Sequence, residues 1–247
     1  MGLKLELGLK DKVILVSGGA SGIGQEIVKK LQVLEAIPIV FDKVARVEAT
    51  WEQGSNDLPL PLWFTVDLVE EGLCRNAVYE IIDRFGRIDG LVNNAGVNDS
   101  VGLESSPDQF RASIEANLTH YFTMTHLCLD LLKKNKAAIV NIGSKVSFTG
   151  QGNTSGYAAS KGGITSLTRE WAADLASFGI RVNAVIPGEV MTPMYERWIN
   201  SFESPKEKLE NNDYDVMKTI KDYMLNGKES ELKKIKTETT STNQVLM

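Results

Sequence analysis

The segment Val13-Ile14-Leu15-Val16-Ser17-Gly18-Gly19-Ala20-Ser21-Gly22-Ile23-Gly24 decides the fold of this chain of 247 residues. Four consecutive apolar residues predict a strand buried on both faces of a sheet, and the glycines after them predict a tight turn that leads into a helix. Residues without a Cβ allow backbone N–H groups to approach an anion at a helix N-terminus. Such a turn can also be a tight loop that binds nothing. If it binds a pyrophosphate, the candidate contacts are Gly18, Ser21, Gly22, Ile23 and Gly24.

Short β-rich apolar runs alternate with longer helical patterns along the chain, and this alternation is typical of a parallel sheet with crossover helices. We therefore predict an α/β fold, a single-domain doubly wound parallel sheet with helices on both faces. The expected strands are Lys12–Ser17, Ile37–Phe41, Leu62–Val66, Ile88–Asn93, Ala137–Ile142 and Arg181–Ile186. The expected helices lie near Gly22–Leu34, Gly72–Phe85, Pro107–Lys134 and Ser155–Phe178, and Lys43–Pro61 is expected to be a helix fragment and a loop.

Composition and charge argue against several classes of function. The net charge of −5 gives no electrostatic reason to bind nucleic acid or an anionic membrane surface. No apolar run approaches the ~20 residues of a membrane span, and charged residues near the N-terminus leave no core for a signal peptide. Cys74 and Cys128 are too few and too far apart for a disulfide framework, so we expect a reduced, cytoplasmic protein. The spacing of His120 and His126 does not place two ligands on one helical face, so no metal site is expected.

A carboxylate after the second predicted strand indicates which dinucleotide the turn would accept. Asp42 follows Ile39-Val40-Phe41. An acidic side chain there can accept hydrogen bonds from both ribose hydroxyls of NAD and would repel the 2′-phosphate of NADP. Lys43 comes next and could neutralise part of such a phosphate, and Asp42 could also be an ordinary turn residue. The sequence therefore favours NAD and leaves NADP open.

Two residues of the helix expected at 155–178 have the spacing of an acid–base pair. Tyr157 and Lys161 lie at i and i+4, so their side chains share one helical face, and Ser144 ends an apolar strand upstream. A free tyrosine has a pKa near ~10, but a nearby ammonium and an oxidised nicotinamide ring would favour the phenolate. Tyr157 would then take the proton of a substrate hydroxyl while Ser144 holds the same oxygen. A Tyr–Lys pair at this spacing is also common on exposed helices, and Ser144 could simply cap a turn.

Taken in order, these motifs resemble those of the short-chain dehydrogenase/reductase family over roughly residues 10–210, and the resemblance extends to Asp67-Leu68, Asn93-Asn94-Ala95-Gly96, Pro187-Gly188 and Thr192-Pro193. It implies a Rossmann-like fold and hydride transfer between NAD(P) and a hydroxyl group, with a tetrad of Asn117, Ser144, Tyr157 and Lys161. In this family pattern, Lys161 also grips the nicotinamide ribose and Asn117 holds a water of a proton relay. The implied cofactor contacts beyond the glycine turn and Asp42 are Asp67, Leu68, Asn94, Ala95, Gly96, Tyr157, Lys161, Pro187, Gly188, Val190 and Thr192.

Several stretches, among them Gly150-Gln151-Gly152-Asn153-Thr154-Ser155-Gly156-Tyr157, resemble bacterial L-fucose dehydrogenases and related sugar dehydrogenases more specifically. This implies a small-molecule substrate, an L-fucose-like aldose or a polyol. Polar side chains suit it, because a buried donor or acceptor rejects analogues that leave it unpaired. The candidate substrate residues are Asn98, Asp99, His120, Gln151, Asn153, Glu189, Met194, Tyr195 and Trp198. Each could instead be a solvated loop residue, and Tyr195 and Trp198 could pack a lid helix. A 3-oxoacyl thioester reductase, a nucleotide sensor and an inactive remnant stay open as alternatives.

The character of the chain changes near Asn211, where lysines and acids precede a run rich in threonine. We divide the chain into a dinucleotide-binding and catalytic domain, residues 1–210, and a polar tail, residues 211–247, expected to be partly helical or disordered. Family members continue into a last strand near an Asp-Gly-Gly sequence, and this strand is missing here. A frameshift, a truncation or a divergent replacement would each explain the difference. The resemblance implies a homodimer or tetramer, whereas an uncovered strand at Arg181–Ile186 would favour aggregation.

Overall fold

The computed structural model describes residues 7–45, 60–201 and 203–204. The chain separates into two compact units, Met1–Tyr195 and Glu196–Met247. The first unit contains the whole sheet. In the second unit, the described residues form the end of helix α6 (Pro193–Ile199) and a short turn after it, in which the N–H of Asn200 donates to the Glu196 carbonyl at 2.9 Å. The predicted boundary near residue 211, most of Lys43–Pro61 and the polar tail lie outside the described residues.

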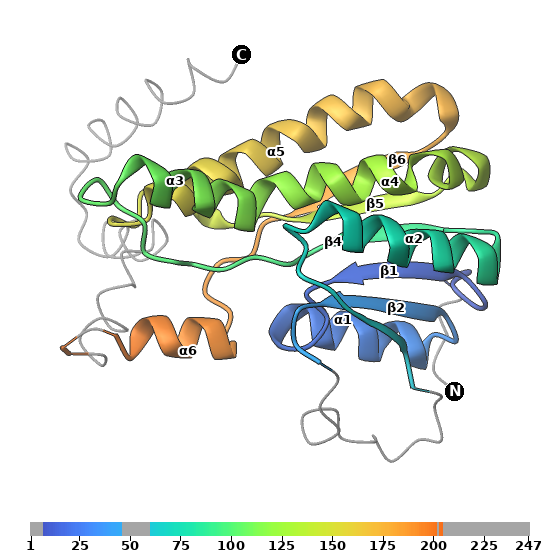
Figure 1. The fold of residues 1–247 in the computed structure, drawn as a ribbon, viewed down its shortest axis with the longest axis horizontal. Coiled ribbons are helices and arrows are strands. Elements are labelled where there is room, and N and C mark those ends of the chain that lie inside the picture. The colour runs from blue at the N-terminus through green and yellow to red at the C-terminus, as the bar shows by residue number, and fades with distance from the viewer. Residues whose placement is uncertain (1–6, 46–59, 202, 205–247) are drawn as a thin grey trace, which may run out of the picture. The chain divides into compact units, whose positions relative to one another are not determined.

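The first unit is built on a single sheet of six parallel strands in the order β3-β2-β1-β4-β5-β6, so the predicted α/β class is confirmed (Figure 1). All six predicted strands are present, each within one or two residues of its expected limits. Their bounds are β1 (Val13–Ser17), β2 (Ile37–Asp42), β3 (Leu62–Thr65), β4 (Gly90–Asn93), β5 (Ala138–Ile142) and β6 (Arg181–Val185). The helices between them are α1 (Gly22–Val33), α2 (Glu71–Phe85), α3 (Pro107–Ile114), α4 (His120–Asn135) and α5 (Ser155–Leu175).

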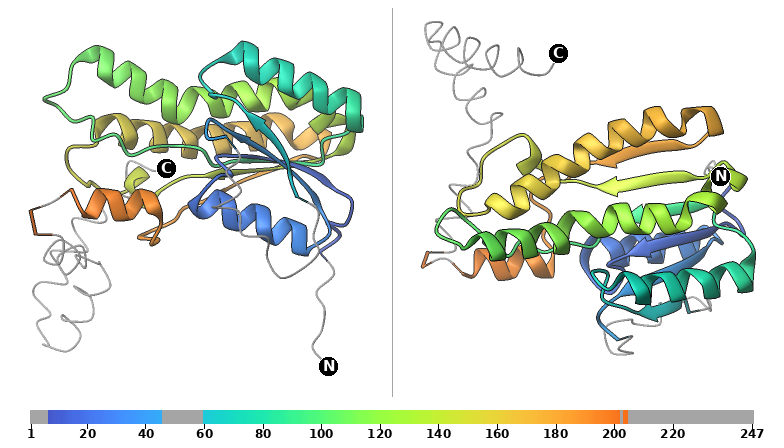
Figure 2. Two further views of the ribbon diagram at one scale, coloured as in Figure 1. Left: turned by 60° about the horizontal axis from the view of Figure 1, so that its bottom comes forward. Right: turned by 45° about the horizontal axis from the view of Figure 1, so that its top comes forward.

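Helices cover both faces of the sheet because side chains alternate between the two faces along each strand. Leu15, Ile39 and Leu91 point to the face where α2, α4 and α5 pack, and they belong to the larger of two buried clusters. Val16 and Val40 point to the opposite face and pack with Val28 of α1. Figure 2 shows the same arrangement from two further directions, with α1 across the sheet from α2, α4 and α5. Burial on both faces explains why the central strands are continuous apolar runs.

The order of the strands indicates where a ligand site lies. Strands are added on one side of β1 up to β3 and on its other side from β4 onward, so the strand order reverses between β1 and β4. From β1 the chain runs outward to β2 and β3, and β4 then pairs with β1 on the other side, Leu15 beside Leu91. In open parallel sheets, ligands bind outside the carboxyl ends of the strands at such a reversal. The glycine turn begins at the carboxyl end of β1 with Gly18, and the Asn-Asn-Ala-Gly motif begins at the carboxyl end of β4 with Asn93.

The long helix predicted at Pro107–Lys134 is interrupted in the structure. A π-helical turn, η1 (Glu115–Thr119), separates α3 from α4. The prediction from periodicity misses it because one wide turn barely changes the pattern of apolar residues. Such turns are frequent at functional sites, and this one contains Asn117. The helix predicted to end at Phe178 is α-helical to Leu175 and ends in a 3₁₀ turn, η3 (Ala176–Phe178).

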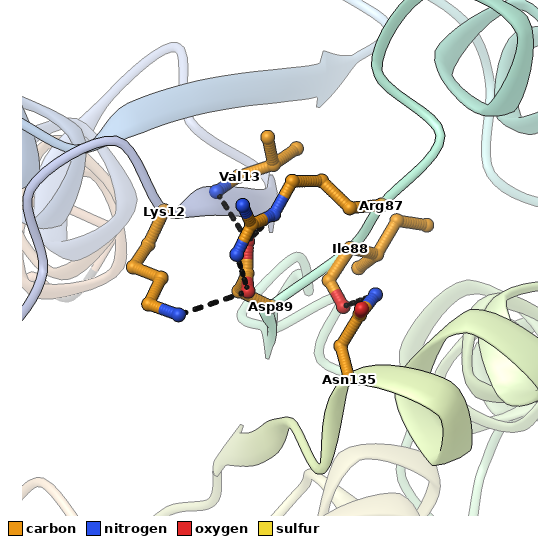
Figure 3. A network of polar contacts seen from close by, with 6 residues as sticks. All are labelled: Lys12, Val13, Arg87, Ile88, Asp89 and Asn135. Carbon is orange, nitrogen blue, oxygen red and sulfur yellow. Dashed lines mark hydrogen bonds and ion pairs between the residues drawn. The ribbon is translucent and has the colours of Figure 1, made fainter.

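At the amino ends of the strands, one buried carboxylate ties β1 to β4 (Figure 3). Oδ2 of Asp89 accepts hydrogen bonds from the Val13 N–H at 3.0 Å and from Arg87 Nε at 2.8 Å. Its Oδ1 accepts from Arg87 at 2.6 Å and from Lys12 Nζ at 3.3 Å. Nearby, the Asn135 amide donates to the Ile88 carbonyl at 3.1 Å. These contacts lie at the opposite end of the sheet from the candidate site, so they serve the fold.

Strand β6 ends the sheet in the part of the chain that the structure describes, where no strand pairs with its outer side. Val182 is buried against the helices, whereas Val185 is 52% exposed. The residues where the sequence lacks the expected last strand lie outside the described ranges. Within those ranges, no helix has the length and apolar character needed to cross a membrane.

Candidate active site

The glycine turn forms a backbone cradle at the start of α1. Gly18 has φ +68°, and a Cβ there would lie 2.8 Å from the Cα of Ala95, so neither the conformation nor the space admits a side chain. A Cβ at Gly24 would lie 2.1 Å from the Gly18 carbonyl oxygen. Helix α1 has no acidic residue in its first turn, and the side chain of its N-cap, Ser21, makes no capping hydrogen bond. The cradle therefore fits the pyrophosphate of a dinucleotide, which would meet backbone N–H groups and a helix N-terminus.

Hydrogen bonds hold this turn against the loop after β4. The Ser17 hydroxyl oxygen accepts from the backbone N–H groups of Asn94 at 2.9 Å and Ala95 at 3.1 Å. The Asn94 amide donates in return to the carbonyl oxygens of Ser17 and Gly18, both at 3.0 Å. Ser17 did not emerge from the sequence as a functional residue. Its one signal there is a hydroxyl at the end of an otherwise apolar strand.

Asp42 lies directly beside the cradle. Its Oδ2 accepts from the Ala20 N–H at 2.9 Å, and its Oδ1 accepts from the Val44 N–H at 3.0 Å. The carboxylate thus stands next to the turn that would hold the pyrophosphate, where the ribose reader of a dinucleotide is expected. Lys43 is exposed and extends from the same loop.

The other predicted cofactor residues come from the loops after β3 and β6. Asp67 is exposed and accepts from the Val69 N–H at 3.2 Å, while Leu68 is buried in the core. A Cβ at Gly22 would lie 3.5 Å from the side chain of Thr192, so the loop after β6 reaches the glycine turn. Pro187, Gly188 and Val190 lie earlier on that loop, which is braced by a hydrogen bond from the Lys145 N–H to the Pro187 carbonyl at 3.0 Å.

Tyr157 and Lys161 come together as their spacing predicts, and Ser144 lies beside them as the family resemblance implies. Tyr157 and Lys161 lie one turn apart near the start of α5, with Lys161 Nζ 5.6 Å from the centre of the Tyr157 ring. Ser144 follows β5, and its side chain lies near enough to the Tyr157 phenol to lower the pKa of that phenol. Both α5 residues are buried, Tyr157 being 7% and Lys161 3% exposed. The exposed Tyr–Lys pair that the sequence left open is therefore excluded.

Lys161 is held by two groups that no motif in the sequence indicates. Its Nζ donates to the Ile142 carbonyl oxygen at 2.8 Å and to the Tyr121 hydroxyl at 3.2 Å. Burial lowers the pKa of Lys161 to about 7. The ammonium and the neutral amine are therefore both present near neutral pH.

Asn117 lies in the π-helical turn and is fully buried. Its Oδ1 accepts from the Val97 N–H at 2.7 Å, and its Nδ2 donates to the Ser113 carbonyl at 3.0 Å. A Cβ at Gly96 would lie 3.0 Å from Asn117 Oδ1 and 3.5 Å from Lys161 Nζ, so these residues meet around one point of the loop after β4. All four residues of the predicted tetrad thus gather at the carboxyl ends of β4 and β5.

Burial alone acts against the predicted chemistry of Tyr157. In the free protein burial raises the pKa of its phenol, and the Ser144 side chain only partly opposes that rise. The same burial weakens the positive charge of Lys161. A phenolate at neutral pH therefore needs charge beyond that of the chain, and the oxidised nicotinamide ring would bring it.

The predicted substrate residues are distributed around this centre. His120 begins α4 and is 2% exposed, and its Nε2 donates to the Ala116 carbonyl at 3.1 Å. Burial and, second, the charge of Lys161 lower the pKa of His120 to about 4, so the ring is neutral. Among the described residues, its Nδ1 has no hydrogen-bond partner.

Of the remaining substrate candidates, Glu189 has the clearest placement, because it forms an ion pair with Lys145, the residue after Ser144. Asn153 lies in the loop before α5 with φ +50°, and its side chain covers Gly102. Asn98 follows β4 and Gln151 precedes α5, both half-buried, whereas Asp99 is exposed. Met194 and Tyr195 lie in the first turn of α6, and Trp198 belongs to the second unit.

The fold and the site together define a dinucleotide-binding α/β protein in which Ser144 lies beside a buried Tyr–Lys pair. The short chain dehydrogenase family model matches residues 12–201. This chain belongs to the short chain dehydrogenase family, and it is an NAD(P)-dependent oxidoreductase that acts on CH–OH groups of small molecules.

Three individual proteins illustrate what this chain is similar to. An L-fucose dehydrogenase of Bos taurus is 36% identical over 196 residues, covering 78% of this chain and 72% of the relative. The crystal structure of the Cj0485 dehydrogenase superposes with a TM-score of 0.76 at 39% identity, covering 84% of this chain and 80% of that one. An aldohexose dehydrogenase of Thermoplasma acidophilum in its ligand-free form superposes with a TM-score of 0.71 at 26% identity, covering 81% and 77%.

Proposed function

We propose that this chain is an NAD-dependent dehydrogenase of a sugar or polyol, with an L-fucose-like aldose as the substrate class. The observation that carries the proposal is the centre in which the half-buried Ser144 acts on the pKa of the buried Tyr157, and the buried Lys161 lies one helical turn away. These residue types at this spacing suit removal of a proton from a hydroxyl group.

In the proposed reaction, Tyr157 takes the proton of the substrate hydroxyl. Ser144 donates a hydrogen bond to the same substrate oxygen and keeps it in line with the phenol. When bound, the oxidised dinucleotide accepts the hydride from the substrate carbon. Lys161 in its ammonium form lowers the pKa of Tyr157 against the opposing effect of burial. Asn117, fixed by hydrogen bonds with Val97 and Ser113, would hold a water that links Lys161 to solvent as a proton relay.

The choice of NAD over NADP rests on Asp42. Its carboxylate stands 2.9 Å from the Ala20 N–H of the glycine turn. A negative charge at this point favours a ribose with two free hydroxyls and repels a 2′-phosphate. The remaining cofactor contacts in the proposal are the backbone of the glycine turn, the loop Asn94-Ala95-Gly96 and Thr192.

The sugar substrate is supported by polar chemistry next to the centre and by the relatives. The ion pair of Lys145 and Glu189 presents donors and an acceptor beside Ser144, and both side chains are partly exposed, at 42% and 36%. A hydroxyl-rich molecule can use both signs of charge, whereas an acyl chain uses neither. L-fucose dehydrogenase and aldohexose dehydrogenase among the relatives agree with this substrate class.

A spectrophotometric assay tests the proposal. The purified protein is given NAD or NADP with a panel of aldoses and polyols, and reduced nicotinamide is followed by absorbance; acetoacetyl thioester is tested in the reverse direction. Oxidation of an aldose with NAD is the expected result. Activity with the thioester and NADPH, but with no sugar, would instead identify a 3-oxoacyl thioester reductase.

Removing the phenol tests the mechanism separately. Tyr157→Phe should reduce turnover by about 10³-fold or more, because the proton acceptor is lost, while NAD binding by fluorescence stays nearly unchanged. Tyr79→Phe is the matched control, since Tyr79 is 58% exposed on α2. Turnover that survives in Tyr157→Phe would refute the role assigned to Tyr157.

A further inference from the structure

A second phenol lies next to the ammonium of Lys161. Tyr121 is fully buried on α4, forty positions before Lys161 in the sequence, and its hydroxyl is 3.2 Å from Lys161 Nζ. The same hydroxyl lies 3.0 Å from the Ile142 carbonyl oxygen, to which Lys161 also donates at 2.8 Å. Three groups from α4, α5 and the end of β5 therefore close a triangle of hydrogen bonds.

The directions of these hydrogen bonds follow from the chemistry of the groups. A carbonyl oxygen can only accept, so the single proton of the Tyr121 hydroxyl points to Ile142. Towards Lys161 the phenol oxygen must then accept, and an ammonium has no capacity except to donate. Burial raises the pKa of Tyr121 well above its usual value, so the hydroxyl stays neutral and keeps this arrangement. Two of the three N–H groups of Lys161 are thereby held, and one remains for other groups of the site.

Within the described residues, no anionic group pairs with the ammonium of Lys161. The titratable groups that face Lys161 are Tyr121 and His120 from α4 and Tyr157 from its own helix. Burial keeps both phenols and the imidazole neutral. No carboxylate of the described chain pairs with Lys161. The stability of the ammonium therefore depends on two neutral oxygens, those of Ile142 and Tyr121.

We propose that Tyr121 is a positioning residue that holds the ammonium of Lys161 in place and thereby supports the acidity of Tyr157. The inference rests on the proposed roles of Tyr157 and Lys161. Tyr121 does not exchange a proton with substrate. It acts through Lys161, since loss of its oxygen would leave the ammonium with a single carbonyl and favour the neutral amine. The weaker ammonium would in turn leave Tyr157 protonated to a higher pH.

Tyr121→Phe is a suitable test because it removes one oxygen and little else. The ring and its packing are kept, and the Ile142 carbonyl retains the hydrogen bond from Lys161. The first measurement is the titration of Lys161 in the free protein by ¹⁵N NMR of the lysine side chains, with Lys161→Met used for assignment. The midpoint should fall by about one pH unit in Tyr121→Phe, the tenfold change expected for a lost hydrogen bond to a charged group. Tyr79→Phe, at an exposed position of α2, should leave it unchanged.

The second measurement is the pH dependence of kcat/KM for the oxidised substrate. In Tyr121→Phe the rising limb should move about one unit to higher pH, so the rate at neutral pH falls about tenfold and recovers at alkaline pH. KM for NAD should change less than kcat. An unchanged Lys161 midpoint would overturn the inference, and so would an equal loss of rate at every pH, which would indicate a packing role.

The two proposals fail separately in these measurements. If no sugar or polyol is oxidised but the Lys161 midpoint falls in Tyr121→Phe, the substrate class is wrong and the role of Tyr121 stands. If sugars are oxidised and the midpoint does not move, the role of Tyr121 is refuted and the substrate class stands.

Discussion

Lys161→Met should make the protein more stable while removing its activity. Lys161 is 3% exposed, and burial lowers its pKa from 10.5 to about 7. Each tenfold change in proton affinity corresponds to about 1.4 kcal/mol, so keeping the ammonium buried costs about 5 kcal/mol. Methionine fills nearly the same volume without a charge. The variant also loses the hydrogen bonds that Lys161 makes to Ile142 and Tyr121, and this loss offsets about 1–2 kcal/mol of the gain in stability.

The sign of the pH dependence follows from the two states. Below pH 7 the folded and unfolded chains both hold the proton, and the full cost is present. Between about 7 and 10.5 the unfolded chain keeps the proton and the folded chain releases it, so the stability of the wild type rises with pH. Methionine does not titrate. The variant should therefore exceed the wild type by about 3 kcal/mol at pH 6, and the difference should shrink to near zero at about pH 9.

Urea unfolding at a series of pH values measures this difference directly, with the free energy of unfolding taken from the midpoint and the slope. Comparing variant with wild type cancels the titration of Cys74 and Cys128, whose pKa values burial raises to about 11 and about 12. Lys134→Met, at an exposed position of α4, is the control and should leave the pH dependence as it is. If Lys161→Met is no more stable at pH 6, or if the difference is constant with pH, Lys161 does not carry the cost that its burial implies.

Three further predictions concern other parts of the chain. The free energy of unfolding of the wild type should fall by about 3 kcal/mol as the pH drops from 6.5 to about 4, because His120 binds a proton in the unfolded chain at a higher pH than in the folded chain. Urea unfolding should find this loss absent in His120→Asn. The loss should be present in the control His126→Asn, because the side chain of His126 is exposed. Asp42→Ala should shift the ratio of kcat/KM for NAD over NADP about tenfold towards NADP, and an unchanged ratio would count against Asp42 as the ribose reader. Asp89→Asn should lower the free energy of unfolding by roughly 2 kcal/mol, because it weakens the hydrogen bonds from Arg87 and Lys12. The value of kcat should not change, since Asp89 lies at the end of the sheet opposite the candidate site.

The sheet and the main elements of the candidate site could be predicted because their signals are local. Val13-Ile14-Leu15-Val16 must be buried on both faces, and a Cβ-free turn after it leaves few alternatives to a backbone cradle. The spacing of Tyr157 and Lys161 places them on one helical face wherever the helix lies. The six strands of the structure follow the predicted ones closely for the same reason.

Features that depend on distant parts of the chain could not be predicted. The π-helical turn around Asn117 leaves no clear mark on the pattern of apolar residues. Ser17 meets Asn94 across 77 positions, and an isolated serine after a strand does not indicate its partner. The ion pair of Lys145 and Glu189 likewise joins two loops that only the order of the strands brings together.

By itself, then, the amino-acid order determined the parallel sheet, the cradle for a dinucleotide and the set of reactive side chains, because hydrophobic periodicity and residue spacing act over a few positions. Tertiary structure alone decided how those side chains ionise. The charge of Lys161 depends on its burial and on oxygens from Ile142 and Tyr121, and in the proposed mechanism the acidity of Tyr157 depends in turn on that charge. Desolvation and hydrogen bonding are properties of the assembled neighbours, so they appear only once the chain has folded.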